Sequence, residues 1–202
     1  MYRAAAVIIL LFMIPVLGTA QDRNNPDVDD WEEYRTDQYV RGDKSIIISL
    51  GTLFPLFFTN NGSFRDMKFT PPLGASGYIS YNYFLTSNIF IGGEGGVQFM
   101  PSIAGDTLYT IPFGLRGGYQ FKLWRIEIPV SLTAGFALQR FLSFGYFGFF
   151  MKAGVAGYYR ITSAWSLGLA ASWYWFPQWT NDPARNMDGH LLDLTLSARY
   201  SF

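Results

Sequence analysis

The sequence predicts an all-β protein: an eight-stranded antiparallel up-and-down transmembrane β-barrel. Three observations lead to this fold class. Only 15% of the 202 residues are charged, whereas 19% are aromatic and 21 are glycine, so few charged side chains are available to cover a water-facing surface. From residue 45 onward, eight runs of alternating apolar and polar residues follow one another. The connections between the runs also alternate in length, as in barrels with short turns at one rim and longer loops at the other.

The first 20 residues read as a secretory signal peptide that is cleaved near Ala20. Arg3 provides the positive start, residues 4–17 are apolar, and Gly18, Thr19 and Ala20 are small residues of the kind found at a cleavage site. The apolar stretch is short for a membrane-spanning helix, which disfavours an uncleaved anchor.

Residues 21–44 form an acidic N-terminal segment that we expect on the periplasmic side. They contain eight acidic and four basic residues with little apolar periodicity. Such a composition is typical of a solvated segment that leads into a first strand.

Residues 45–202 are predicted to form the barrel. The eight strands are expected at 45–58, 72–85, 89–100, 108–121, 126–139, 145–161, 165–177 and 190–202, with ends uncertain by a few residues. The connections at 86–88, 122–125 and 162–164 are short, whereas those after 58 and 177 are long and polar. This arrangement places both ends of the barrel chain at the short-turn rim.

The last strand has the clearest pattern. One face carries Leu192, Leu194, Leu196, Ala198, Tyr200 and Phe202, and the other carries Asp193, Thr195, Ser197, Arg199 and Ser201. With Tyr200 and Phe202 at its end, this strand resembles the carboxy-terminal assembly signal of bacterial outer-membrane β-barrels. The resemblance implies a location in outer-membrane lipid and recognition of Tyr200 and Phe202 by the outer-membrane assembly machinery.

A bundle of membrane helices is the competing architecture, because residues 161–181 carry no charge. The other candidate spans, however, are interrupted by Glu94, Arg116, Glu127 and Lys152. In helices these charges would face an apolar environment, whereas in strands all four fall on the inward face. The barrel is therefore favoured.

The inward charges are predicted to form ion pairs between strands. Turn geometry places Glu94 opposite Arg116 and Glu127 opposite Arg160, and it places Lys152, Tyr174 and Asp193 in one row, with Lys152 paired to Asp193. These pairs could simply hold a filled barrel together, because an eight-stranded barrel is just wide enough for side chains to fill.

The outer half of the lumen is predicted to be aromatic. Its inward residues are Phe57, Met100, Tyr146, Phe150, Tyr174 and Phe176. They could line a vestibule for a small hydrophobic ligand. Here the chain resembles the small eight-stranded outer-membrane proteins, in particular the OmpW-like group, which implies uptake of small hydrophobic compounds. OmpX-like and OmpA-like barrels are the competing resemblance, and they imply a structural or surface-interaction barrel with a filled interior and partner-binding loops at 59–71 and 178–189.

Other functions find little support in the sequence. The only histidine, His190, has Asp188 nearby but no serine spaced to act as a nucleophile, so no enzyme is predicted. One histidine and no cysteine predict no metal site, and no cofactor is expected. The net charge of zero argues against a nucleic-acid partner, and we expect a monomer.

Overall fold

The structure is a computed structural model of the chain. It describes residues 39–60, 63–65, 73–101, 107–141, 144–178 and 186–202. The predicted signal peptide and most of the acidic N-terminal segment lie outside these residues, as do large parts of the two predicted partner-binding loops, so those predictions remain predictions.

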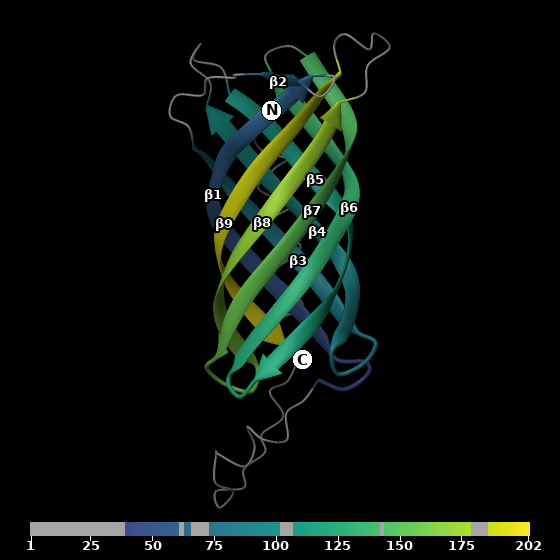
Figure 1. Ribbon diagram of the computed structural model, residues 1–202. Helices are drawn as coiled ribbons and strands as arrows, with labels where there is room; N and C mark the ends of the chain where they lie inside the picture. The colour runs from purple at the N-terminus through teal and green to yellow at the C-terminus, as the bar shows by residue number, and fades with distance from the viewer. Residues whose placement is uncertain (1–38, 61–62, 66–72, 102–106, 142–143, 179–185) are drawn as a thin grey trace, which may run out of the picture.

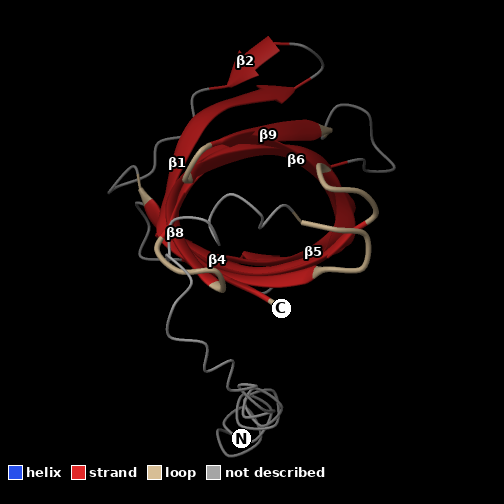
Figure 2. Ribbon diagram, turned by 90° about the horizontal axis from the view of Figure 1, so that it is seen from below, coloured by secondary structure: helices blue, strands red, loops and turns tan. Residues whose placement is uncertain are grey.

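Within the described residues, eight long strands and one short strand form a single antiparallel sheet. They are β1 (Lys44–Asn60), β2 (Ser63–Arg65), β3 (Gly74–Phe84), β4 (Ile89–Pro101), β5 (Thr107–Leu123), β6 (Ile126–Phe141), β7 (Phe144–Arg160), β8 (Trp165–Gln178) and β9 (Met187–Ser201). Each long strand pairs with its neighbour in the chain, and β9 pairs with β1, which closes the barrel. Figure 2 shows the closed ring from below.

The predicted fold class is therefore confirmed. The observed strands agree with the predicted runs to within a few residues. The start of β1 and the end of β9 lie at the rim with the tight turns (Figure 1). The small strand β2 was not predicted; it folds back on the outer end of β1. We call the rim that carries β2 the outer rim, and the opposite rim the periplasmic rim.

Alternation places polar side chains inside and apolar side chains outside. Fully buried inward residues include Ser45, Ser80, Asn82, Gln120, Thr133, Asp193 and Arg199. Large apolar residues exposed on the outer wall include Leu50, Ile79, Leu115, Leu132, Val155, Leu169 and Leu196. This inversion of the soluble pattern suits a barrel surrounded by lipid, where every backbone group is satisfied within the closed sheet. Among the described residues there is no helix long and apolar enough to cross a membrane.

The last strand joins the first at the periplasmic rim. The backbone N–H of Lys44 donates to Phe202 over 3.0 Å, and the N–H of Phe202 donates back to Lys44 over 3.0 Å. The outward rings of Tyr200 and Trp165 pack beside one another, with centroids 5.0 Å apart. Aromatic side chains at this level are typical of a membrane interface. Recognition of Tyr200 and Phe202 by assembly machinery stays a prediction.

The prediction that Phe57 points inward is wrong. The pairing of β1 with β9 shifts between Pro55 and Phe57, which marks a β-bulge. One extra residue reverses the alternation beyond that point. Phe58 consequently packs against the lumen cluster, whereas Phe57 is 38% exposed and stacks on His190 with ring centroids 4.2 Å apart.

Candidate functional site in the barrel lumen

At the periplasmic end, one carboxylate is shared by two arginines. Glu127 on β6 forms ion pairs with Arg160 on β7 and with Arg199 on β9. Gln120 links the same groups, because its amide donates to Glu127 over 2.9 Å and its oxygen accepts from Arg199 over 3.1 Å. Glu127 is 2% exposed, so these charges are held in a nearly water-free setting. The structure thus brings the predicted partners Glu127 and Arg160 together and adds Arg199 to them.

Tyr39, which precedes β1, packs against inward side chains at this end of the lumen. Its ring stacks on Phe84 with centroids 4.0 Å apart and an interplanar angle of 7°. Its hydroxyl lies 2.9 Å from the Ser201 hydroxyl, and the Lys122 ammonium lies 4.8 Å from the ring centroid. Both guanidinium groups that contact Glu127 also lie within 6 Å of this ring. Tyr39 belongs to the segment predicted to be a solvated lead-in, yet only 5% of it is exposed.

A second layer of charges crosses the middle of the lumen. Glu94 on β4 accepts from Arg116 on β5 over 2.9 Å and from Lys152 on β7 over 2.6 Å. The Ser80 hydroxyl donates to the same carboxylate over 3.0 Å. Residue Gly114, not Arg116, lies directly opposite Glu94 in the sheet, so the predicted pair forms along a diagonal.

The predicted pair between Lys152 and Asp193 is replaced by other contacts. Lys152 lies opposite Tyr174 as expected, but its ammonium reaches across the lumen to Glu94. Asp193 lies opposite Ser172 and accepts from the Ser76 hydroxyl over 2.7 Å. The prediction followed the register from one strand to the next, whereas closure of a narrow barrel brings side chains from opposite walls within reach.

Above this layer, aromatic and aliphatic side chains form a buried cluster inside the lumen. The buried cluster consists of Leu53, Tyr78, Met100, Ala137, Phe150, Tyr174, Phe176 and Leu191. The rings of Tyr174 and Phe176 are stacked with centroids 5.4 Å apart, and Phe150 lies 6.1 Å from Tyr174 and 5.9 Å from Phe176. The exposed fraction of every residue in the cluster is between 0% and 6%. Four of the six predicted vestibule residues are therefore in contact with one another.

The remaining two predicted vestibule residues lie elsewhere. Phe57 faces outward, as described above. Tyr146 points inward by the alternation of β7 and lies opposite Gln139, nearer the outer rim than the cluster. Sequence reasoning missed Leu53, Tyr78, Ala137 and Leu191 as members of the cluster, although all four share the inward parity of their strands and could have been found from it. For Tyr39 there was no such signal, because it precedes β1.

His190 lies near the outer rim of the barrel wall on β9. Its ring is on the outward face, stacked between Phe57 and Trp173 with centroids 4.2 Å and 5.4 Å away. The Asp188 carboxylate accepts a hydrogen bond from Thr59. In the part of the chain that the structure describes, no three His, Cys, Asp or Glu side chains are grouped so that they could hold a metal ion.

Comparisons with solved structures agree with this architecture. Neisserial surface protein A has a TM-score of 0.57 at 12% identity, over 80% of this chain and 97% of that structure. The outer membrane protein OprG from Pseudomonas aeruginosa has a TM-score of 0.54 at 9% identity, over 81% and 97%. Ail, the attachment invasion locus protein of Yersinia pestis, has a TM-score of 0.50 at 12% identity, over 81% and 100%. At these identities the likeness concerns the fold.

Comparisons at the sequence level find relatives and a family. Two proteins of Treponema pallidum (strain Nichols), each described as an uncharacterized protein, are 27% identical over 161 and 131 residues. These matches cover 70% and 64% of this chain but only 55% and 60% of the relatives, so the chain spans little more than half of their length. A protein-family model matches residues 21–200. The chain therefore belongs to the family defined by that model, and its structure is that of a small eight-stranded outer-membrane β-barrel.

Proposed function

We propose that the protein is a closed barrel of the outer membrane that does not conduct solutes and acts through its outer rim as a structural or surface-interaction protein. The observation that carries this proposal is the packed lumen. Met100, Phe150, Tyr174 and Phe176, which would line a hydrophobic vestibule, are buried against one another. Rings at these separations are in direct contact, which supports a packed lumen.

The two charged layers beneath the cluster support a closed lumen. Glu94 holds cations from β5 and β7, and Glu127 holds cations from β7 and β9, so each carboxylate connects strands across the lumen. Opening a path through the lumen would separate buried charges from their partners, at a cost of several kcal/mol for each layer. Tyr39 adds a third obstruction at the periplasmic rim.

Uptake of a small hydrophobic molecule is the alternative proposal. It requires the rings of the cluster to separate, and the bulge in β1 removes Phe57 from the vestibule. Membership of the OmpW-like group, from which this alternative arose, also stays a prediction. Barrels of similar fold include one named as a surface protein and one named for attachment and invasion, which offers a precedent for the surface role.

Permeability measurements distinguish the two proposals. The full-length protein, folded into phosphatidylcholine vesicles, should admit a small hydrophobic fluorophore no faster than protein-free vesicles, and in planar bilayers it should show no conductance steps. Phe150→Leu, which keeps an apolar side chain, and Phe150→Asp test the cluster. Entry that exceeds the protein-free rate would by itself overturn the proposal in favour of uptake, and a change in that rate in Phe150→Leu would place the path through the cluster.

The outer-rim role has a separate test. Cells that display the protein are compared with cells that display a variant in which residues 179–185 are replaced by a Gly-Ser linker. We expect normal surface levels of the variant and reduced attachment to cultured epithelial cells. Equal attachment at equal surface levels would remove the interaction part of the proposal and leave a purely structural barrel.

A further inference from the structure

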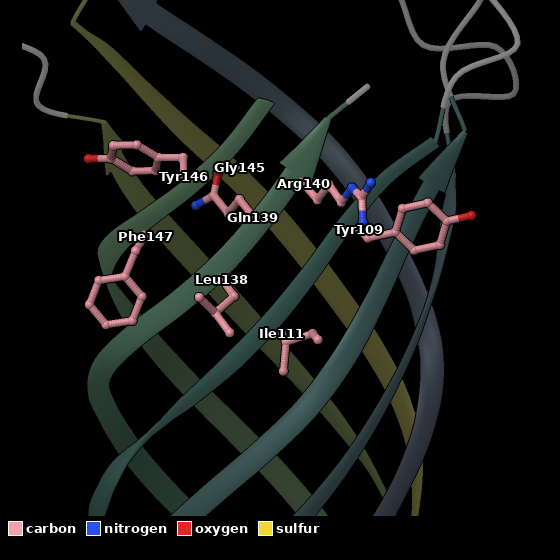
Figure 3. A pocket seen from close by; sticks show the side chains of 8 residues that line it. All are labelled: Tyr109, Ile111, Leu138, Gln139, Arg140, Gly145, Tyr146 and Phe147. Atoms are coloured by element: carbon pink, nitrogen blue, oxygen red, sulfur yellow. The ribbon is translucent and has the colours of Figure 1, made fainter. Parts of the chain in front are cut away.

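An open groove of about 880 Å³ lies on the outer wall of the barrel near the outer rim. Its lining comes from three adjacent strands, β5, β6 and β7 (Figure 3). The lining residues are Tyr109, Ile111, Leu138, Gln139, Arg140, Gly145, Tyr146 and Phe147. All except Gln139 and Tyr146 lie on the outward face by the alternation of their strands. Most of the groove's lining therefore faces the surrounding lipid, and not the lumen.

Strand register arranges the outward residues in two rows. The row nearer the rim is Tyr109, Arg140 and Gly145, and the row below it is Ile111, Leu138 and Phe147. The upper row contains the Arg140 cation and, next to it, open space at Gly145. A Cβ atom added at Gly145 would meet nothing within 4 Å. The lower row is entirely apolar, with exposed fractions of 47% to 55%. A cation therefore lies directly above an apolar surface.

The apolar surface continues toward the middle of the barrel wall. The rings of Phe136 and Phe147 are stacked with centroids 5.1 Å apart, and Phe149 packs edge-on against Phe136 at 6.4 Å. An extended hydrocarbon chain that started in the groove would continue along these rings without meeting a charged group. Packing of the hydrocarbon chain against these rings would contribute van der Waals attraction to the free energy of lipid binding.

Arg140 differs from the other cationic residues of the long strands in its position on the outward face near the outer rim. Among the long strands as described, it is the only lysine or arginine on the outward face near the outer rim, because Arg116, Lys122, Lys152, Arg160 and Arg199 point inward and Lys44 lies at the periplasmic rim. The described carboxylates that form ion pairs, Glu94 and Glu127, do so inside the lumen. Arg140 is exposed. A cation between the outer rim and an apolar band is placed where the head groups of a surrounding bilayer would meet its apolar layer.

We propose that this groove binds one anionic phospholipid. The Arg140 guanidinium takes the phosphate of the head group, since its planar set of N–H donors matches phosphate oxygens. An acyl chain lies over Ile111, Leu138 and Phe147, and the space beside Gly145 accommodates the start of the glycerol backbone. An arginine that merely extended its charge to water would need neither the gap at Gly145 nor a particular lipid. The inference depends on a membrane location but not on whether the lumen is closed.

Native mass spectrometry of the full-length protein, folded in maltoside micelles, tests the site. The protein is titrated with phosphatidylglycerol and, separately, with phosphatidylcholine, and circular dichroism with a heat-modifiable gel shift verifies that each variant is folded. We expect one phosphatidylglycerol molecule to be retained more strongly than phosphatidylcholine. Arg140→Gln should weaken phosphatidylglycerol binding by about tenfold or more, because a hydrogen bond between charged groups is lost.

A second groove variant and two matched controls isolate the features of the groove. Gly145→Val fills the gap and should weaken binding of both lipids, whereas Gly157→Val, which also meets open space on the outward face of β7, should have no effect. Lys44→Gln removes an outward charge at the opposite rim and should leave the preference for phosphatidylglycerol unchanged. Unchanged phosphatidylglycerol binding in both Arg140→Gln and Gly145→Val, or an equal loss in Lys44→Gln, would overturn the proposal.

Discussion

Replacing Glu127 with glutamine removes one buried negative charge and leaves the shape of the side chain almost unchanged. The wild-type carboxylate faces Arg160 and Arg199, and the exposed fractions of the three side chains are 3%, 9% and 2%. The amide of the variant offers one acceptor oxygen where two oxygens accepted before. It also turns an NH₂ donor toward guanidinium donors. At least one arginine is then left buried without its counter-charge.

The expected loss follows from the cost of an uncompensated buried charge. Breaking a buried ion pair by removing one partner costs about 3–5 kcal/mol in the free energy of unfolding. Arg199 keeps the Gln120 oxygen at 3.1 Å, which moderates its share of that loss. We therefore expect Glu127→Gln to lower the free energy of unfolding by about 3–4 kcal/mol, with no added cavity. Arg160→Gln leaves Glu127 paired with Arg199 and should cost only about 1.5–3 kcal/mol, the contribution of one charge-assisted hydrogen bond.

Urea titration of the protein folded into lipid vesicles measures these losses. Fluorescence of the six tryptophans and the heat-modifiable gel shift provide two readouts, and coincident folding and unfolding curves justify a two-state treatment. The double variant Glu127→Gln, Arg160→Gln is the informative control, because it should lose less than the sum of the single variants. A loss below about 1 kcal/mol for Glu127→Gln, or strict additivity in the double variant, would refute the reasoning that this carboxylate neutralises the periplasmic layer.

Three further predictions test packing. Tyr39→Ala should lower the free energy of unfolding by about 2–4 kcal/mol because the buried ring leaves a cavity, whereas Tyr39→Phe should lose about 1 kcal/mol; an unchanged urea midpoint in Tyr39→Ala would show that the ring is not part of the fold. Phe150→Asp should prevent folding into vesicles or shift the urea midpoint strongly, since it buries an unpaired charge, and wild-type stability would contradict a packed lumen. Gly96→Val should impair folding because its Cβ would lie 2.6 Å from a backbone oxygen of β3, whereas Gly157→Val should fold normally; equal gel shifts of the two would count against the observed packing.

Strand positions and facing could be predicted from the sequence because they depend on local alternation. Along β9, for example, every second residue is apolar, and a closed sheet in lipid requires apolar side chains on one face only. The same rule assigned Glu94, Arg116, Glu127, Lys152 and Arg160 to the interior before any contact was known. The number of strands followed from the number of such runs.

Assigning side chains to the inward or outward face by alternation gives the wrong face beyond a point where a strand contains one extra residue. The bulge between Pro55 and Phe57 reverses the outer end of β1, so Phe58 takes the inward position that alternation assigns to Phe57. Pairing with β9 determines where the bulge lies, and that pairing joins residues far apart in the chain. The alternation along one strand contains no information about the position of such a bulge.

Which buried charges pair with one another in the lumen was decided only by the tertiary structure. The register through β8 suggested that Lys152 would meet Asp193, yet Lys152 reaches Glu94 on the opposite wall, and Arg199 reaches Glu127 in the same way. The diameter of the closed barrel sets these distances, and the diameter is a property of the whole sheet. The burial of Tyr39 has the same origin, because the cavity that receives its ring exists only once β1 and β9 have closed the barrel around it.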